Sequence, residues 1–283
     1  MVKMKRKYAH APEPEAPQKK RKKKRRRGGS RILLYITLAF LAVVTLVICS
    51  LTVLFHIQTI EVTGDSVADL YPSQQIISAS GLQTDVNIIM ADTGHVEETL
   101  TRVMPYIGSV EVVKHFPSSV ELRITRAVVA GQIESGGSYI LIDENGKCLE
   151  QKTQPIKGAP VIRGTVVTAA QAGETVQFQQ EQALELFQSI RSVLQSRQID
   201  GITVIDIGSS QELSATYQNR IVLNFGGSGY LEQKADYAAL IIEQQKSGGQ
   251  TGVLNLSRIP NDRQQAYFTA GVLTDEQTAD VLD

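Results

Sequence analysis

An uninterrupted apolar run near the N-terminus limits what this chain can fold into more than any other feature. Residues 32–55 read ILLYITLAFLAVVTLVICSLTVLF and contain no charged side chain. As an α-helix that rises ~1.5 Å per residue, this run extends roughly 36 Å, which is enough to cross a hydrocarbon core of ~30 Å with some tilt. The sequence therefore predicts one transmembrane helix over residues 32–55, which is set apart from the soluble fold.

Charge is divided unequally on the two sides of this run. Residues 1–31 carry 14 Lys and Arg against Glu13 and Glu15, whereas the remaining 252 residues carry 15 basic and 27 acidic side chains. Lys and Arg are enriched on the cytoplasmic flank of membrane helices, so we predict a cytoplasmic N-terminus and extracytoplasmic domains. We expect a disordered tail that is attracted to anionic lipid headgroups. The basic side chains beside the run are Lys22, Lys23, Lys24, Arg25, Arg26, Arg27 and Arg31.

Other interpretations of these two segments fit less well. A cleaved signal peptide has a shorter apolar region of ~7–15 residues and a small-residue cleavage site, which residues 49–52 do not supply. A lipoprotein anchor at Cys49 would place the bulky Ile48 where a small residue is needed. A basic run can also bind nucleic acid, but beside a membrane span we interpret it as a topology determinant. Cys49 at membrane depth and Cys148 outside are not expected to pair.

After the span, residues 56–126 predict a small module in the order β-α-α-β-β. Its strands are recognised by alternating apolar and polar residues, and its helices by apolar residues every three or four positions. We expect Ser73 to cap the first helix and Gly81 to end it, and Val96, Leu100, Val103 and Met104 to lie on one buried face of the second. The expected elements are a strand over 57–63, helices over 73–81 and 92–104, and a hairpin of strands over 109–115 and 119–125.

Residues 127–273 predict a second, mainly antiparallel α+β domain. It is expected to open with two strands joined by the turn Glu144-Asn145-Gly146, followed by a stretch rich in Gly and Pro up to Ala172. Apolar periodicity then predicts two amphipathic helices among further short strands. These elements are helices over 182–198 and 231–246, strands over 203–207, 213–217 and 221–225, of which the last two are joined by a tight turn over 218–220, and a final pair over 253–257 and 264–268.

The order of these elements behind one membrane span resembles the FtsQ/DivIB bacterial cell-division family. The residues KHFPSSVELRITR, from Lys114 to Arg126, resemble the POTRA module of that family. Residues 139–146 and 160–164 resemble its hairpin and its proline-glycine segment. At the junction, Thr125-Arg126-Ala127-Val128 differs from the usual Glu-Arg-x-Pro. The resemblance implies a tail over 1–31, a POTRA-like domain over 56–126, a β domain over 127–273 and a C-terminal tail over 274–283.

No motif points to catalysis. His95 with Glu97 and Glu98 is the nearest approach to a metal cluster, but these residues are typical of the exposed first turn of a helix. The glycine loop 226–229 lacks the Lys-Ser/Thr of a phosphate-binding loop, and residues 143–146 lack the remaining ligands of a calcium loop. We therefore predict no catalytic residue, no cofactor, no metal and no small-molecule substrate.

The last predicted strand is the candidate functional site. An edge strand offers unpaired backbone groups to which a partner can add a strand of its own. The resemblance implies docking of division proteins of the FtsB/DivIC and FtsL type through Ser257, Arg258, Tyr267 and Phe268. Alternatively, Tyr267 or Phe268 fills the core behind the strand. The implied function is a non-catalytic scaffold at the division septum. The alternatives are an envelope enzyme acting on peptidoglycan and a POTRA-type component of polypeptide transport.

Overall fold

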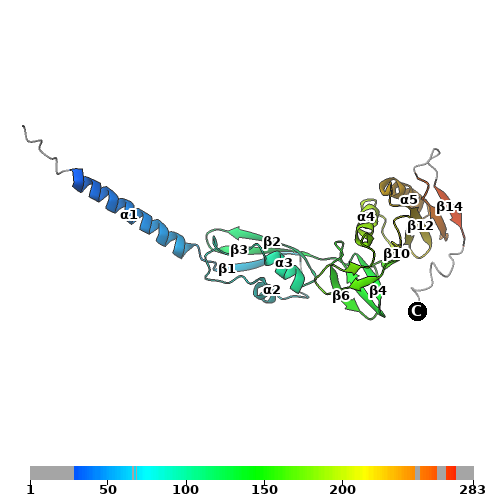
Figure 1. Ribbon diagram of the computed structural model, residues 1–283, viewed down its shortest axis with the longest axis horizontal. Helices are drawn as coiled ribbons and strands as arrows, with labels where there is room; N and C mark the ends of the chain where they lie inside the picture. The colour runs from blue at the N-terminus through cyan, green and yellow to red at the C-terminus, as the bar shows by residue number, and fades with distance from the viewer. Residues whose placement is uncertain (1–28, 66, 68, 246–248, 260–265, 272–283) are drawn as a thin grey trace, which may run out of the picture. The chain divides into compact units, whose positions relative to one another are not determined.

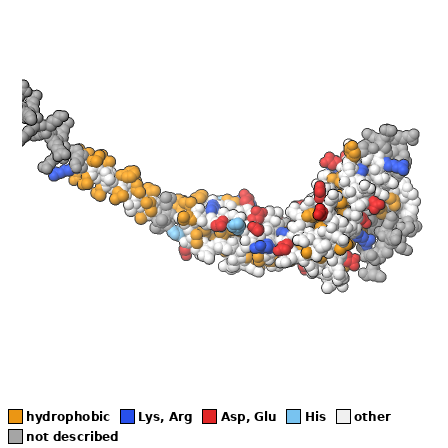
Figure 2. Space-filling view, viewed as in Figure 1, with side chains coloured by type: hydrophobic (Ala, Val, Ile, Leu, Met, Phe, Trp, Pro, Cys, Tyr) orange, Lys and Arg blue, Asp and Glu red, His pale blue; other side chains and the backbone are white. Residues whose placement is uncertain are grey.

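A computed structural model describes residues 29–65, 67, 69–245, 249–259 and 266–271 (Figure 1). The helix α1 spans Gly29–Leu54, and its segment Arg31–Cys49 is long and apolar enough to cross a membrane. Apolar side chains cover the part of this helix shown in colour in Figure 2. The hydroxyls of Thr37 and Thr45 each donate to the carbonyl four residues earlier at 2.9 Å, which satisfies them within the apolar helix. The predicted tails, except Gly29 to Arg31, lie outside the described residues.

The first extramembrane domain has the predicted order β-α-α-β-β. Its sheet has the strand order β1-β3-β2, with β1 parallel to β3 and β2 antiparallel to it. In β3, Val120, Leu122 and Ile124 are at most 1% exposed and pack towards the core, while the alternate residues face solvent. The elements are β1 (Thr59–Gly64), α2 (Ser73–Ser80), α3 (Val96–Val103), β2 (Ile107–His115) and β3 (Ser119–Arg126).

Both helices of this domain begin or end differently from the prediction. Ser73 does not cap α2: the N-cap is Pro72 and no side chain caps the helix, although Gly81 ends it in the left-handed conformation at φ 72° as expected. The helix α3 starts at Val96 instead of residue 92, because the Asp92 carboxylate accepts a hydrogen bond from the Gly94 amide at 3.0 Å and holds this segment in a turn.

The buried face of α3 also differs at its last residue. Val103 is 60% exposed, not buried as predicted, whereas Leu100 and Met104 are buried. The backbone leaves the helical conformation at Met104, where φ is −123° and ψ is 83°. Met104 therefore packs against the core, whereas Val103, which regular helical spacing would place on the same face, is turned towards solvent.

The second domain is built on one nine-stranded sheet with the order β14-β13-β12-β11-β10-β7-β4-β5-β6. Five of its neighbouring pairs are antiparallel and three are parallel, so the predicted mainly antiparallel character is present. Its strands are β4 (Gly131–Ser135), β5 (Ser138–Ile142), β6 (Cys148–Lys152), β7 (Val161–Arg163), β10 (Ile202–Asp206), β11 (Leu213–Tyr217), β12 (Ile221–Gly226), β13 (Gly252–Asn255) and β14 (Tyr267–Ala270).

Two helices and a small ribbon complete the described part of this domain. The helices α4 (Ala183–Ser196) and α5 (Leu231–Gln245) contribute Phe187, Ile190 and Ala238 to the same core cluster as the central strands. The strands β8 (Val167–Ala169) and β9 (Gln177–Phe178) form a separate antiparallel pair.

The sequence prediction for the start of this domain was wrong in two places. Three strands replace the expected two, because Gly136 and Gly137, at φ 59° and 78°, form a tight turn between β4 and β5. The Gly/Pro-rich stretch also holds β7, which lies parallel between β4 and β10. The amide side chain of Gln132 holds the preceding loop by donating to the carbonyls of Ile156 and Ala159 at 2.9 and 2.8 Å.

Candidate partner-binding edge

The strand β14 forms one edge of the nine-stranded sheet. Among the described strands it pairs only with β13, antiparallel, with Gly252 opposite Ala270 and Asn255 opposite Tyr267. The strand β13 is itself parallel to β12 and belongs to the sheet interior. Because β14 has a described neighbour on one side alone, its other side is a candidate for strand addition.

The opposite edge of the sheet, β6, is partly covered by the protein's own chain. The amide of Cys148 donates to the carbonyl of Glu174 at 2.8 Å, and the amide of Gly173 donates back to the carbonyl of Cys148 at 2.8 Å. These bonds satisfy the outer side of β6 at its first residue. Of the two edges, β14 is therefore the better candidate for a partner.

The ladder alternation identifies which backbone groups of β14 face outwards. The amide of Gly271 donates to the carbonyl of Thr251 at 3.1 Å. Thr251 and Gly271 are therefore one of the hydrogen-bonded residue pairs of the antiparallel ladder. Hydrogen-bonded and non-hydrogen-bonded pairs alternate along such a ladder. It follows that residues 267 and 269 direct their amides towards β13, and that Phe268 and Ala270 direct theirs away from the sheet.

The structure distinguishes between the two aromatic candidates on β14. Phe268 lies opposite the fully buried Leu254 and packs, half-buried, against the main core cluster. The core-filling alternative therefore describes the ring of Phe268, while its backbone amide remains at the outer side. Tyr267 lies opposite Asn255 in the register, and its side chain lies outside the described part.

Ser257 and Arg258 are exposed residues of the turn that follows β13. The side-chain oxygen of Asn255 accepts hydrogen bonds from the amide of Ser257 at 3.0 Å and from its hydroxyl at 2.7 Å, which fixes the turn. Because Asn255 is opposite Tyr267, the turn and the first residue of β14 lie at the same end of the β13–β14 pair. The four predicted residues thus belong to one hairpin, whose connection over 260–265 lies outside the described residues.

Gly252 allows β14 to approach β13 closely. A Cβ atom added to Gly252 would lie 2.3 Å from the carbonyl oxygen of Thr269 and 2.9 Å from Cζ of Phe268. A side chain at this position would push the edge strand away. No element predicted from the sequence included Gly252. A glycine directly before an apolar run can indicate a close backbone approach, and this pattern could have identified the position.

Of the predicted topology residues, the structure describes Arg31 alone. It is exposed in the first turns of α1 and is the first residue of the candidate span. Lys22, Lys23, Lys24, Arg25, Arg26 and Arg27 lie outside the described residues, so their role stays a prediction.

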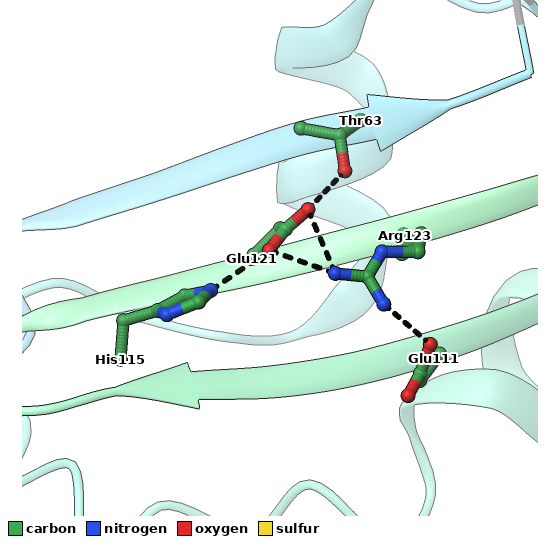
Figure 3. A network of polar contacts seen from close by, with 5 residues as sticks. All are labelled: Thr63, Glu111, His115, Glu121 and Arg123. Carbon is green, nitrogen blue, oxygen red and sulfur yellow. Dashed lines mark hydrogen bonds and ion pairs between the residues drawn. The ribbon is translucent and has the colours of Figure 1, made fainter.

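A second polar feature covers the outer face of the three-stranded sheet and was not predicted as a network. Figure 3 shows Glu121 on β3 between Thr63 on β1 and His115 on β2. The Thr63 hydroxyl donates to Glu121 at 2.5 Å, His115 Nε2 lies 2.8 Å from it, and Arg123 joins Glu121 to Glu111. The hydrogen bonds from Thr63 and then from His115 lower the pKa of Glu121 from 4.5 to about 2. The network ties the three strands together at their solvent face.

The glycine loop before α5 is held by a side chain that the sequence reading missed. Lys234 is only 3% exposed, and its ammonium donates to the carbonyl of Gly227 at 2.7 Å. Burial lowers the pKa of Lys234. A lysine on an amphipathic helix is usually exposed, so its position in the sequence did not predict that Lys234 would be buried.

Within the described ranges, no group of three or more His, Cys, Asp and Glu side chains could hold a metal, and the absence of catalysis stays a prediction.

An apolar helix, a β-α-α-β-β domain and a nine-stranded α+β domain define this chain as a single-pass membrane protein with two extramembrane domains. Residues 55–125 match the POTRA domain of FtsQ type, and residues 131–259 match the C-terminal domain of the cell division protein FtsQ/DivIB. The chain belongs to the FtsQ/DivIB family, as the resemblance predicted. The strand β14 follows the end of the second match.

Individual relatives agree with this assignment. The cell division protein DivIB of Clostridium acetobutylicum is 28% identical over 205 residues, which cover 72% of this chain and 80% of the relative. The corresponding protein of Clostridium tetani is 23% identical over 208 residues, covering 72% and 76%. The cell division protein FtsQ of Streptomyces griseus is 23% identical over 106 residues, and this chain spans about half of its length, 51%.

Proposed function

We propose that this protein is a non-catalytic scaffold of bacterial cell division, which holds other single-span division proteins at the septal membrane. The observation that carries the proposal is the edge strand β14, whose Phe268 and Ala270 amides face away from the sheet. A partner strand can add to such an edge through backbone hydrogen bonds, while alternate side chains set specificity. Membership of a family whose relatives are named as cell division proteins supports the division role.

The proposed partners are division proteins of the FtsB/DivIC and FtsL type. In this arrangement the N-terminal tail is cytoplasmic, and both domains are outside the membrane that α1 crosses. The β13–β14 hairpin supplies the docking surface, with Ser257, Arg258 and Tyr267 at one end and Phe268 anchoring the strand to its own core. Confinement to one membrane raises the effective concentration of partners, so a short strand can suffice when it acts with other weak contacts.

A substitution at Ala270 tests this mechanism without disturbing the internal ladder. Proline has no amide hydrogen and is tolerated on edge strands when that position faces outwards. Ala270→Pro therefore removes an outward donor, while residues 267, 269 and 271 keep their bonds to β13. Ala270→Thr is the matched control, because it keeps the amide and favours a strand.

The assay is co-purification of the full-length protein with FtsB/DivIC-type and FtsL-type proteins from dividing cells. We expect Ala270→Pro to lose most of the captured partner and Ala270→Thr to retain it, with similar thermal unfolding of the two variants. Equal capture by both variants would refute strand addition at β14.

A further inference from the structure

A cluster of exposed apolar side chains lies at one end of the first domain. Eleven large apolar side chains are exposed in the described part of residues 54–271, and five of them belong to this end. We call these five the apolar end patch: Leu54 at 55%, Val86 at 40%, Ile89 at 54%, Met90 at 84% and Phe116 at 60% exposure. The other six come from widely separated segments. Contiguous exposed apolar surface marks a binding site for a protein or a membrane.

Backbone and ring contacts bring the segments of the patch together. The amide of Ile88 donates to the carbonyl of Phe55 at 2.8 Å, and the amide of Ile57 donates to the carbonyl of Val86 at 2.9 Å. The rings of Phe55 and Phe116 meet edge to face, with centroids 6.0 Å apart. The loop over 86–91, the β2–β3 hairpin and the first residues after α1 therefore form one end of the domain.

The sheet register identifies which end this is. Thr59 and His115 both pair with Ser119, so β1 begins where β2 ends (Figure 1). The ammonium of Lys114, near the end of β2, donates to the carbonyl of Ala91 at 2.9 Å and fixes the loop against the sheet. The patch thus surrounds the point where the chain enters the domain.

Covalent connection to the membrane span limits how far this end can be from lipid. The charge-free run of the sequence continues to residue 55, and α1 itself ends at Leu54. A span that ends within this run leaves Phe55 inside or beside the interfacial layer, which is ~5–8 Å thick next to a hydrocarbon core. Phe55 and the side chains around it therefore lie within reach of the headgroups, whichever way the domain is turned.

We propose that the apolar end patch inserts into the headgroup layer of the membrane that α1 crosses, and so holds this domain against the bilayer. The high exposure of Met90 indicates a projecting side chain, which suits insertion into lipid better than the concave groove that receives a partner helix. Aromatic and apolar side chains at this depth bind in proportion to the apolar area that they bury. Asp85 and Asp92 flank the loop over 86–91 in the sequence and outnumber the basic Lys114 of the hairpin, so apolar insertion, not net positive charge, provides the attraction.

The absence of tryptophan from the sequence allows a direct test. Met90→Trp gives the full-length protein a single indole, and the variant is reconstituted into liposomes of phosphatidylcholine with and without phosphatidylglycerol. Leu240→Trp is the matched control, because Leu240 is 62% exposed on α5 of the second domain. We expect brominated lipid to quench the indole of the Met90→Trp protein several-fold more than that of the Leu240→Trp protein. Acrylamide should quench it less, and both results should hold in both lipid mixtures.

Phe116→Trp provides a second probe that preserves an aromatic ring, and it should behave as Met90→Trp does. Adding Ile89→Asp to the Met90→Trp protein should reverse lipid quenching, because a carboxylate is costly in the interface. If both probes match the Leu240→Trp control, the proposal is wrong and the patch serves a protein partner. Lipid quenching confined to the anionic vesicles would also overturn it, because attraction would then depend on charge.

Discussion

Replacement of Gly252 by alanine should detach the edge strand β14 without unfolding the domain. The added Cβ would lie 2.3 Å from the carbonyl oxygen of Thr269, where ordinary contacts begin at 3.4 Å. The neighbouring atom belongs to the backbone, so the strand itself must withdraw by roughly 1 Å. Ladder bonds of ~2.9 Å would then exceed the range of a hydrogen bond.

The size of the effect follows from the cost of overpacking, which is ~1–3 kcal/mol. That cost corresponds to a ~5–150-fold increase in the opening of β14. Hydrogen exchange of the full-length protein, read by mass spectrometry over β13 and β14, measures it directly. We expect exchange at Thr269 and Gly271 to accelerate by this factor, while exchange in β10 to β12 stays unchanged.

Gly271→Ala is the matched control for this experiment. Gly271 lies directly after β14, and a Cβ atom added there meets nothing within 4 Å. Its exchange profile should resemble that of the unmodified protein. If Gly252→Ala and Gly271→Ala give the same profile, the close approach of the two strands does not control the edge and the reasoning is refuted.

Two further predictions concern the two domains separately. The pKa of Glu121 is lowered from 4.5 to about 2, so its ionised form stabilises the fold above pH 4.5 and this contribution is lost as the pH falls towards 2. The urea midpoint of the Glu121→Gln protein should therefore decrease less than that of the unmodified protein as the pH falls over this range. Equal decreases in the two proteins would contradict the network. Phe187 is fully buried in the second domain, so Phe187→Ala should lower its free energy of unfolding by ~3–5 kcal/mol. The exposed Glu185→Ala should change it by less than ~0.5 kcal/mol, and equal losses would contradict the assigned core.

Elements with a strong local pattern could be predicted from the sequence. The alternation in β3 and the apolar spacing in α4 place Leu122 and Phe187 in the core, and the structure confirms both. The tight turn between β11 and β12 was also expected, and Gln218 and Asn219 adopt the positive φ values of 49° and 53° that such a turn needs.

Elements that depend on distant partners could not be predicted in this way. The three-residue strand β7 is too short to show a period, and its neighbours β4 and β10 are both distant from it in sequence. Lys234 can be buried because its ammonium donates a hydrogen bond to the carbonyl of Gly227. The helical spacing of Lys234 does not indicate that this acceptor lies nearby.

The sequence by itself determined the apolar helix, the charge division around it and the order of elements, because hydrophobic length and periodicity are local properties of the chain. Tertiary structure alone decided which strand lies at the edge of the nine-stranded sheet and which of its amides face outwards. Strand order and the alternation of hydrogen-bonded pairs along the ladder both depend on pairings between distant segments. It also brought the loop of Val86 and Met90 and the hairpin residue Phe116 to the end of the domain where Phe55 lies, since only folding brings a loop and a hairpin together there.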